Sequence, residues 1–130
     1  MKEELEKKGC IVDELYNPKH KKIQEVMDDY DLIVLCCKMS SKDYHGATQR
    51  IGWNQMMVFW RGYSLQHPKF VFVSFGDPYK LYELPFLRTY VNAYSSSHFT
   101  QRAFVELLLG EIEPKGKSPV ELKGFFERQI

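Results

Sequence analysis

The sequence predicts a single α/β domain built on an open, mostly parallel sheet in three layers. Residues 32–37 and 70–75 are short runs that are apolar at nearly every position, as expected for strands of a parallel sheet that is covered on both faces. Segments with helical periodicity lie between and after these runs, and such alternation implies right-handed crossovers. A length of 130 residues suits one domain with its own core.

The N-terminal part contributes two helices and one weak strand. We expect a short leading helix at residues 2–8 and a strand at residues 11–15. Asn17 followed by Pro18 indicates the start of the next helix, because asparagine caps helices and proline fits the first helical position. Its buried face is predicted from residues spaced i, i+3, i+4 and i+7, namely Ile23, Val26, Met27 and Tyr30.

Two further helices and one further strand follow. A helix over residues 48–64 carries an apolar stripe, which we interpret as core: Trp53, Met56, Met57 and Trp60. A strand is expected within residues 89–94. The last helix begins near Ser97 and stops at Gly110, since glycine suits the left-handed residue that closes many helices. Its predicted inward side chains are Ala103, Phe104, Leu107 and Leu108.

Long loops at residues 39–47 and 76–85 complete the predicted order β-α-β-α-β-β-α, a doubly wound arrangement of flavodoxin or Rossmann type. Residues 111–130 form a tail, and its turn-rich start leads to a last strand at residues 120–122. Pro119 restricts that strand to the edge of the sheet or to its own first residue, because proline cannot donate to a ladder. The whole chain, residues 1–130, is treated as one domain.

Composition and charge exclude several classes of function. The net charge is +1 with acids and bases interspersed, whereas phosphate binding needs a concentrated basic face, so we expect no nucleic-acid partner. No run reaches the ~20 apolar residues of a membrane span, and residues 1–8 lack the apolar core of a signal peptide. The chain as it stands indicates a cytoplasmic location, although a longer parent could be exported. Cys36 and Cys37 end an apolar run and are predicted to be small buried hydrophobes.

The most distinctive loop follows the second apolar run. Ligands of open α/β sheets bind beyond the carboxyl ends of the strands, which makes the turn Gly76, Asp77, Pro78 and Tyr79 the candidate ligand or docking loop. Asp77 could act as an acid or base and Tyr79 as a platform for a sugar or a partner. The structural alternative is a turn in which Asp77 bonds to nearby backbone amides.

Two other functions remain open at this point. A small hydrolase could use Ser74 with Asp77 and a histidine, although the sequence has no Gly-x-Ser-x-Gly elbow. A stand-alone module that binds a small ligand or regulates another protein would need phosphate or flavin contacts after the strands. We expect no metal and no cofactor, because the chain has neither zinc-ligand spacing nor a phosphate-binding glycine motif.

Residues 70–122 carry a resemblance to a known family. The run Phe70-Val-Phe-Val-Ser-Phe-Gly-Asp-Pro-Tyr79 is followed by Leu84-Pro85 and by the strand Tyr90 to Tyr94. Further on come Leu109-Gly-Glu111 and Pro114-Lys-Gly-Lys-Ser-Pro-Val120. In this order the motifs resemble the C-terminal, non-barrel domain of family 3 glycoside hydrolases, in particular that of bacterial β-N-acetylglucosaminidases. Ser118 stands where the family usually has leucine.

The resemblance implies a non-catalytic domain. Family 3 enzymes hydrolyse with retention, using a carboxylate nucleophile on an N-terminal (β/α)8 barrel. A barrel needs at least ~200 residues, and the Lys-His-Phe-Pro-Gly type of barrel signature is absent from this sequence. No catalytic residue of the family can therefore be placed on this chain. The implied partner is the catalytic barrel, on the same or a separate chain, and through it glycans that contain N-acetylglucosamine.

Overall fold

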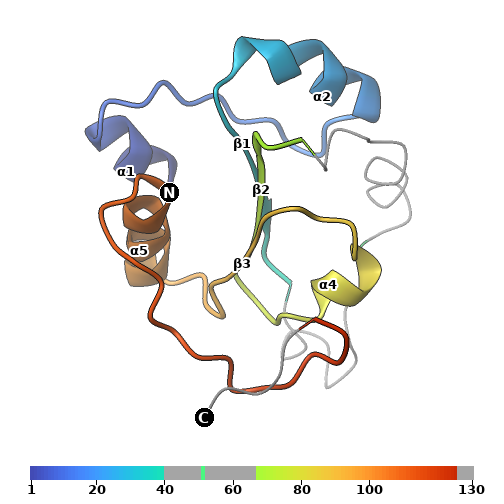
Figure 1. Cartoon of the computed structure of the whole chain (residues 1–130). Coiled ribbons are helices and arrows are strands. Elements are labelled where there is room, and N and C mark those ends of the chain that lie inside the picture. The colour runs from blue at the N-terminus through green and yellow to red at the C-terminus, as the bar shows by residue number, and fades with distance from the viewer. Residues whose placement is uncertain (40–50, 52–66, 126–130) are drawn as a thin grey trace. The chain divides into compact units, whose positions relative to one another are not determined.

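The computed structural model describes residues 1–39, 51 and 67–125. The chain divides into two compact units. One unit is continuous and spans Leu15–Tyr94, and the other combines Met1–Glu14 with Ser95–Ile130. Figure 1 shows the elements of both units.

The continuous unit holds a three-stranded parallel sheet in the order β1-β2-β3. Its strands are β1 (Ile33–Cys37), β2 (Phe70–Ser74) and β3 (Tyr90–Asn92). Ile33 pairs with Phe70 and Cys37 with Ser74, so that β1 and β2 stay in register over five residues, while β3 pairs with β2 from Phe72 to Ser74. The predicted α/β class with a parallel sheet is confirmed, and the strands fall within the three strongest apolar predictions.

Strand β2 is buried on both faces, and one of these faces carries two buried clusters of the unit. Because side chains alternate along a strand, Phe70, Phe72 and Ser74 of β2 share a face. Phe70 packs with Ile23 of helix α2 (His20–Val26), which continues into the 3-10 turn η1 (Met27–Asp29). Phe72 stacks on Tyr90, with ring centroids 5.3 Å apart.

Phe72 also belongs to a second buried cluster, together with Ile51 and Leu84. Leu84 directly follows the short helix α4 (Lys80–Glu83), which lies within the predicted loop 76–85. In Figure 1, α2 lies near the amino ends of the strands and α4 near their carboxyl ends. The core cluster therefore extends to the end of the sheet where the candidate loop lies.

Three predictions for residues 11–37 are wrong. Residues 11–15 contain no strand, and Ile11 is 93% exposed. The helix after Pro18 begins at His20 with Lys19 at the cap, while Asn17 adopts a left-handed φ of 44° and so belongs to the preceding turn. Cys36 is exposed rather than buried.

The discontinuous unit pairs the two ends of the chain. Helix α1 (Lys2–Lys7) packs beside helix α5 (His98–Leu108), as Figure 1 shows. The terminal ammonium of Met1 donates to Gln101 at 2.8 Å, and Lys8 contacts Glu111 at 2.6 Å. The leading helix is confirmed.

Helix α5 ends as predicted at both termini. The Ser97 hydroxyl accepts from the Thr100 N–H, which satisfies one of the donors that a helix start leaves open. Gly110 follows the helix with a φ of 72°, the conformation that favours glycine. Phe104 and Val105 are buried, whereas Ala103 is exposed, contrary to the predicted inward face.

The remaining predictions concern the middle and the tail of the chain. The helix at residues 48–64 lies outside the described residues apart from Ile51. The last strand is reduced to a single bridge at Leu122, although that side chain is fully buried. Pro119 is consistent with so short a pairing, because it withholds a backbone donor.

Candidate functional site

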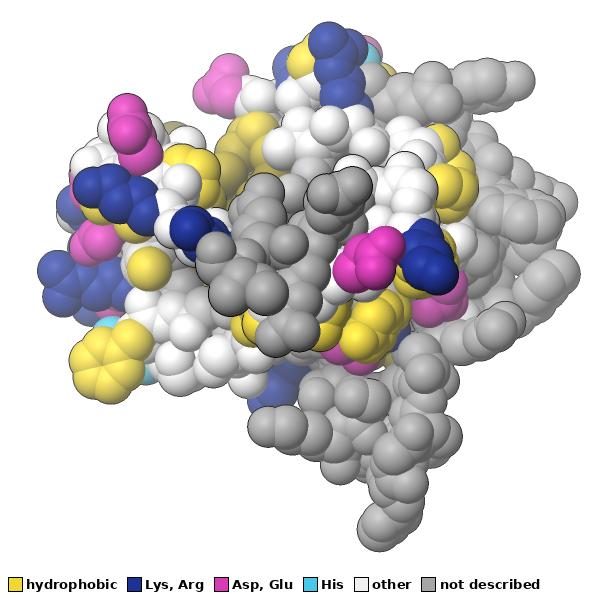
Figure 2. All heavy atoms as spheres, turned by 60° about the horizontal axis from the view of Figure 1, so that its bottom comes forward, with side chains coloured by type: hydrophobic (Ala, Val, Ile, Leu, Met, Phe, Trp, Pro, Cys, Tyr) yellow, Lys and Arg dark blue, Asp and Glu magenta, His cyan; other side chains and the backbone are white. Residues whose placement is uncertain are grey.

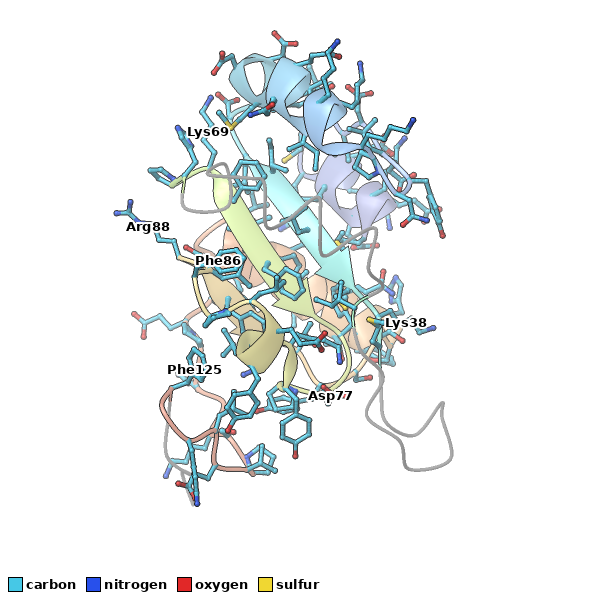
Figure 3. All side chains as sticks on the ribbon, turned by 90° about the vertical axis from the view of Figure 1, so that its right-hand side faces the viewer. Lys38, Lys69, Asp77, Phe86, Arg88 and Phe125 are labelled. Carbon is cyan, nitrogen blue, oxygen red and sulfur yellow. The ribbon has the colours of Figure 1, made fainter. Side chains whose placement is uncertain are left out.

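The candidate loop is a closed turn at the carboxyl end of β2. The hydroxyl of Ser74, fully buried, donates to the Asp77 carbonyl at 2.7 Å. The Asp77 Oδ1 accepts from the Tyr79 N–H at 3.2 Å, the self-bonded turn expected of aspartate before proline. The Tyr90 hydroxyl donates to the Pro78 carbonyl at 3.3 Å, so that β3 also holds the loop. Figure 3 shows Asp77 just beyond the end of the strands.

A second connection ties the turn to the end of β1. The Asp77 N–H donates to the Met39 carbonyl at 3.3 Å, and the Phe75 N–H donates to the Cys37 carbonyl at 2.8 Å. The loop is thus held by backbone groups at and just after the end of β1, by side chains of β2 and β3, and by the Asp77 side chain. Such multiple fixing gives Gly76 to Tyr79 a defined shape.

Lys80, the first residue of α4, lies fully buried between two carboxylates. Its ammonium is 3.5 Å from the Asp77 Oδ1 and 3.8 Å from the Glu83 Oε1. The Asp77 and Glu83 side chains are only 9% and 15% exposed. The other oxygen of Glu83 accepts from the Ile51 N–H at 2.9 Å. We call Asp77, Lys80 and Glu83 the buried ion cluster.

Burial also raises the pKa of two neighbouring side chains, a thiol and a phenol. It raises the pKa of the Cys37 thiol to about 11, and the nearby Lys80 opposes this shift only in part. It likewise raises the pKa of the Tyr90 phenol, against the effect of a hydrogen bond with Ser74. Both groups therefore stay protonated near neutral pH, so that neither supplies a nucleophilic anion there.

Among the described residues, two buried side-chain acceptors have no hydrogen-bond partner. They are the second carboxylate oxygen of Asp77 and the side-chain carbonyl oxygen of Asn92 at the end of β3. Leaving a buried acceptor unpaired is costly, typically about 1–3 kcal/mol. Both lie at the edge of the sheet where open α/β folds place ligands.

The geometry argues against a serine hydrolase. Ser74 is buried and its proton is committed to the Asp77 carbonyl, whereas a nucleophile needs an accessible oxygen and a histidine base. Among the described residues, no histidine hydrogen-bonds to Ser74. His67 accepts from the Lys69 N–H at the amino end of β2, the opposite end of that strand, and His98 lies beside Glu4 in the other unit.

Lys80 and Glu83 are the members of the site that sequence reasoning missed. Lysine in a predicted loop suggests a solvated side chain. The available signal was the spacing of Asp77, Lys80 and Glu83 at i, i+3 and i+6, which places alternating charges on one helical face. That the face is turned inward follows from Leu81 and Leu84, both buried.

Other classes of site find no support in the described part of the chain. Residues 1–39, 51 and 67–125 contain no group of three metal-ligating side chains, and none of their helices has the length and apolarity to cross a bilayer. Figure 2 shows acidic and basic side chains interspersed over the described surface rather than gathered by sign.

Comparison with known proteins gives one informative similarity. The chain is 30% identical over 97 residues to a β-N-acetylglucosaminidase/β-glucosidase of Cellulomonas fimi. The match covers 75% of this chain but only 17% of that enzyme. No family model matches the sequence, and no solved structure matches it. The chain is therefore similar to a short part of a much longer glycosidase.

Proposed function

We propose that this chain is a non-catalytic domain of a glycoside hydrolase of the family 3, β-N-acetylglucosaminidase-like type. Retaining hydrolysis would be carried out by a (β/α)8 barrel outside this chain, and the domain would pack on that barrel. The substrates of the whole enzyme would be glycans that contain β-linked N-acetylglucosamine or glucose.

The similarity to the Cellulomonas fimi enzyme carries this proposal. A match over three-quarters of this chain and a sixth of the relative is what one domain of a larger enzyme would produce. The motifs between Phe70 and Val120 support it independently, because they follow one another in the order typical of that domain. The closed geometry around Ser74 fits a domain without its own nucleophile.

Within the proposal, Gly76 to Tyr79 form the surface that meets the barrel. The loop lies beyond the carboxyl ends of parallel strands, and three separate elements hold it in one shape. The buried ion cluster behind it would act as a rigid support rather than as an acid and base, since Lys80 is fully buried.

An activity measurement with a chimera tests the proposal. The segment of the Cellulomonas fimi enzyme that aligns with this chain is replaced by the corresponding residues of this chain. Release of 4-nitrophenol from its N-acetyl-β-glucosaminide and β-glucoside is then measured. We expect the chimera to hydrolyse at least one of them, and the isolated chain to hydrolyse neither.

The matched control is the same enzyme with the aligned segment deleted. A chimera that folds no better and acts no faster than this deletion would contradict the proposed domain role. Hydrolysis by the isolated chain that disappears in Asp77→Ala would show instead that the chain carries an active site of its own.

A further inference from the structure

Helix α5 carries apolar side chains on more than one face. A surface helix normally confines its apolar residues to one stripe, whereas a helix that is apolar all round is normally covered on both sides. In α5 the apolar residues fall at positions that no single stripe contains: Phe99, Ala103, Phe104, Val105, Leu107 and Leu108. The helix therefore has more apolar surface than one neighbouring element can cover.

The discontinuous unit covers only one of these faces. Phe104 and Val105 are 3% and 1% exposed, whereas Phe99 is 83% exposed and Ala103 is also exposed. Phe99 and Ala103 are four residues apart, which makes them neighbours along one side of the helix. We call Phe99 and Ala103 the outer face of α5. Because a regular helix carries both residues, their exposure is a fixed feature of the unit.

The surroundings of the outer face match the anatomy of a protein interface. Interfaces place an aromatic anchor at the centre and polar side chains around it. Beside the outer face, the Arg102 Nε donates to the Glu106 Oε1 at 2.9 Å. The His98 ring lies edge-on to the Phe99 ring, with centroids 6.2 Å apart. The anchor is thus a phenyl ring, and the neighbouring charges of Arg102 and Glu106 already neutralise each other.

We propose that the outer face of α5 docks on the catalytic part of the parent glycosidase, with Phe99 in an apolar pocket there. This inference rests on the proposed function. The match covers only 17% of the Cellulomonas fimi enzyme, so that most of such an enzyme lies outside this domain and can supply the pocket. An anchor without a net charge beside it fits an apolar pocket better than a charged ligand.

A second copy of the chain fits the outer face less well. Antiparallel packing of two α5 helices, with each Phe99 over the Ala103 of the other, would place the two Arg102 guanidinium groups side by side. Like charges at such a contact oppose association. The catalytic part of the parent is therefore the occupant that the described residues favour.

Hydroxyl-radical footprinting read by mass spectrometry tests this docking directly. The isolated chain is compared with a chimera that carries all 130 residues in place of the aligned segment of the Cellulomonas fimi enzyme. We expect Phe99 to be oxidised at least about fivefold more slowly in the chimera, because an interface anchor is shielded from water. Tyr16, which is 96% exposed and lies outside the outer face, is the internal control and should react equally in both.

A substitution beside the anchor provides the second test. Ala103→Arg places a long charged side chain on the outer face and should return the oxidation rate of Phe99 in the chimera to that of the isolated chain. Ala103→Ser keeps the side chain small and is the matched control, which should retain the protection. Neither change should alter the circular dichroism of the isolated chain, because Ala103 is exposed there.

The outcomes separate this inference from the proposed function. An active chimera in which Phe99 is oxidised as fast as in the isolated chain would overturn the docking of α5 and leave the proposed function intact. So would protection that Ala103→Arg does not remove. Protection that appears in the isolated chain as its concentration rises would assign the outer face to a second copy instead. A chimera no better than the enzyme with the segment deleted would overturn both proposals.

Discussion

Lys80 and Lys21 each lie 3.8 Å from a glutamate three or four residues along a helix, but the side chain of Lys80 is fully buried and that of Lys21 is 88% exposed. Removing one member of a buried ion group leaves uncompensated charge, which typically costs about 3–5 kcal/mol. We therefore expect Lys80→Met to lower the free energy of unfolding by about 3 kcal/mol, measured by urea denaturation.

Lys21→Met is the matched control, because exposed pairs contribute only about 0–1 kcal/mol. Adding Asp77→Asn and Glu83→Gln to Lys80→Met should recover part of the loss, since the stranded carboxylates are then neutral. Equal effects of Lys80→Met and Lys21→Met would show that the buried ion cluster does not stabilise the fold.

The neighbouring cysteines differ in reactivity for a related reason. Burial raises the pKa of Cys37 from its ordinary 9.0 to about 11, which lowers its thiolate fraction at pH 8 by about 100-fold. Cys36 is exposed. We expect Cys37 to react with iodoacetamide at least about ten times more slowly than Cys36, measured by mass spectrometry on chains that retain one cysteine each. Equal rates would contradict the burial of Cys37.

At the scale of elements, the end of α5 depends on one glycine. Gly110 has a φ of 72°, and a methyl group added there would meet no atom within 4 Å. Gly110→Ala should therefore cost only the backbone penalty, about 1 kcal/mol. Gly116, equally open but without a positive φ, is the control, and Gly116→Ala should leave the thermal midpoint unchanged or slightly raised. A similar loss at both positions would rule out this backbone explanation.

Element prediction succeeded where local chemistry and packing agree. For α5, the cap at Ser97 and the stop at Gly110 are both local signals, and the structure uses both. The strand predicted at residues 11–15 is absent, because a segment with strand-like composition also needs a neighbouring strand to pair with. Asn17 was misassigned because asparagine suits left-handed turns as well as helix caps.

Across the whole molecule, the class and the parallel sheet could be predicted because β1 and β2 are apolar on both faces. The candidate site was predictable only in part. Asp77 and Pro78 predict a turn by their residue types alone. The burial of Lys80 depends instead on tertiary contacts around α4, including the backbone of Ile51, and local patterns do not report such contacts.

The two units should lose folding stability at opposite ends of the pH scale. A hydrogen bond from Lys7, with help from His98, lowers the pKa of Glu4 in the discontinuous unit. A lowered pKa stabilises the folded state above the ordinary value of 4.5, and this stabilisation is lost as pH falls. The raised pKa of Cys37 in the continuous unit acts in the opposite direction. Its stabilisation is present below pH 9 and is lost as pH rises to about 11.

Urea denaturation followed by circular dichroism at pH 3, 7 and 10.5 tests this division. The Glu4→Gln variant should lose less stability than the parent between pH 7 and 3, because it has no carboxylate to protonate at that position. Cys37→Ala should lose less between pH 7 and 10.5, because it has no thiol to ionise. Each comparison uses the change with pH rather than the stability at pH 7, since both substitutions also remove contacts that do not titrate. The opposite result would contradict the assignment of these two groups. It would be seen if Glu4→Gln reduced the loss of stability between pH 7 and 10.5, or if Cys37→Ala reduced the loss between pH 7 and 3.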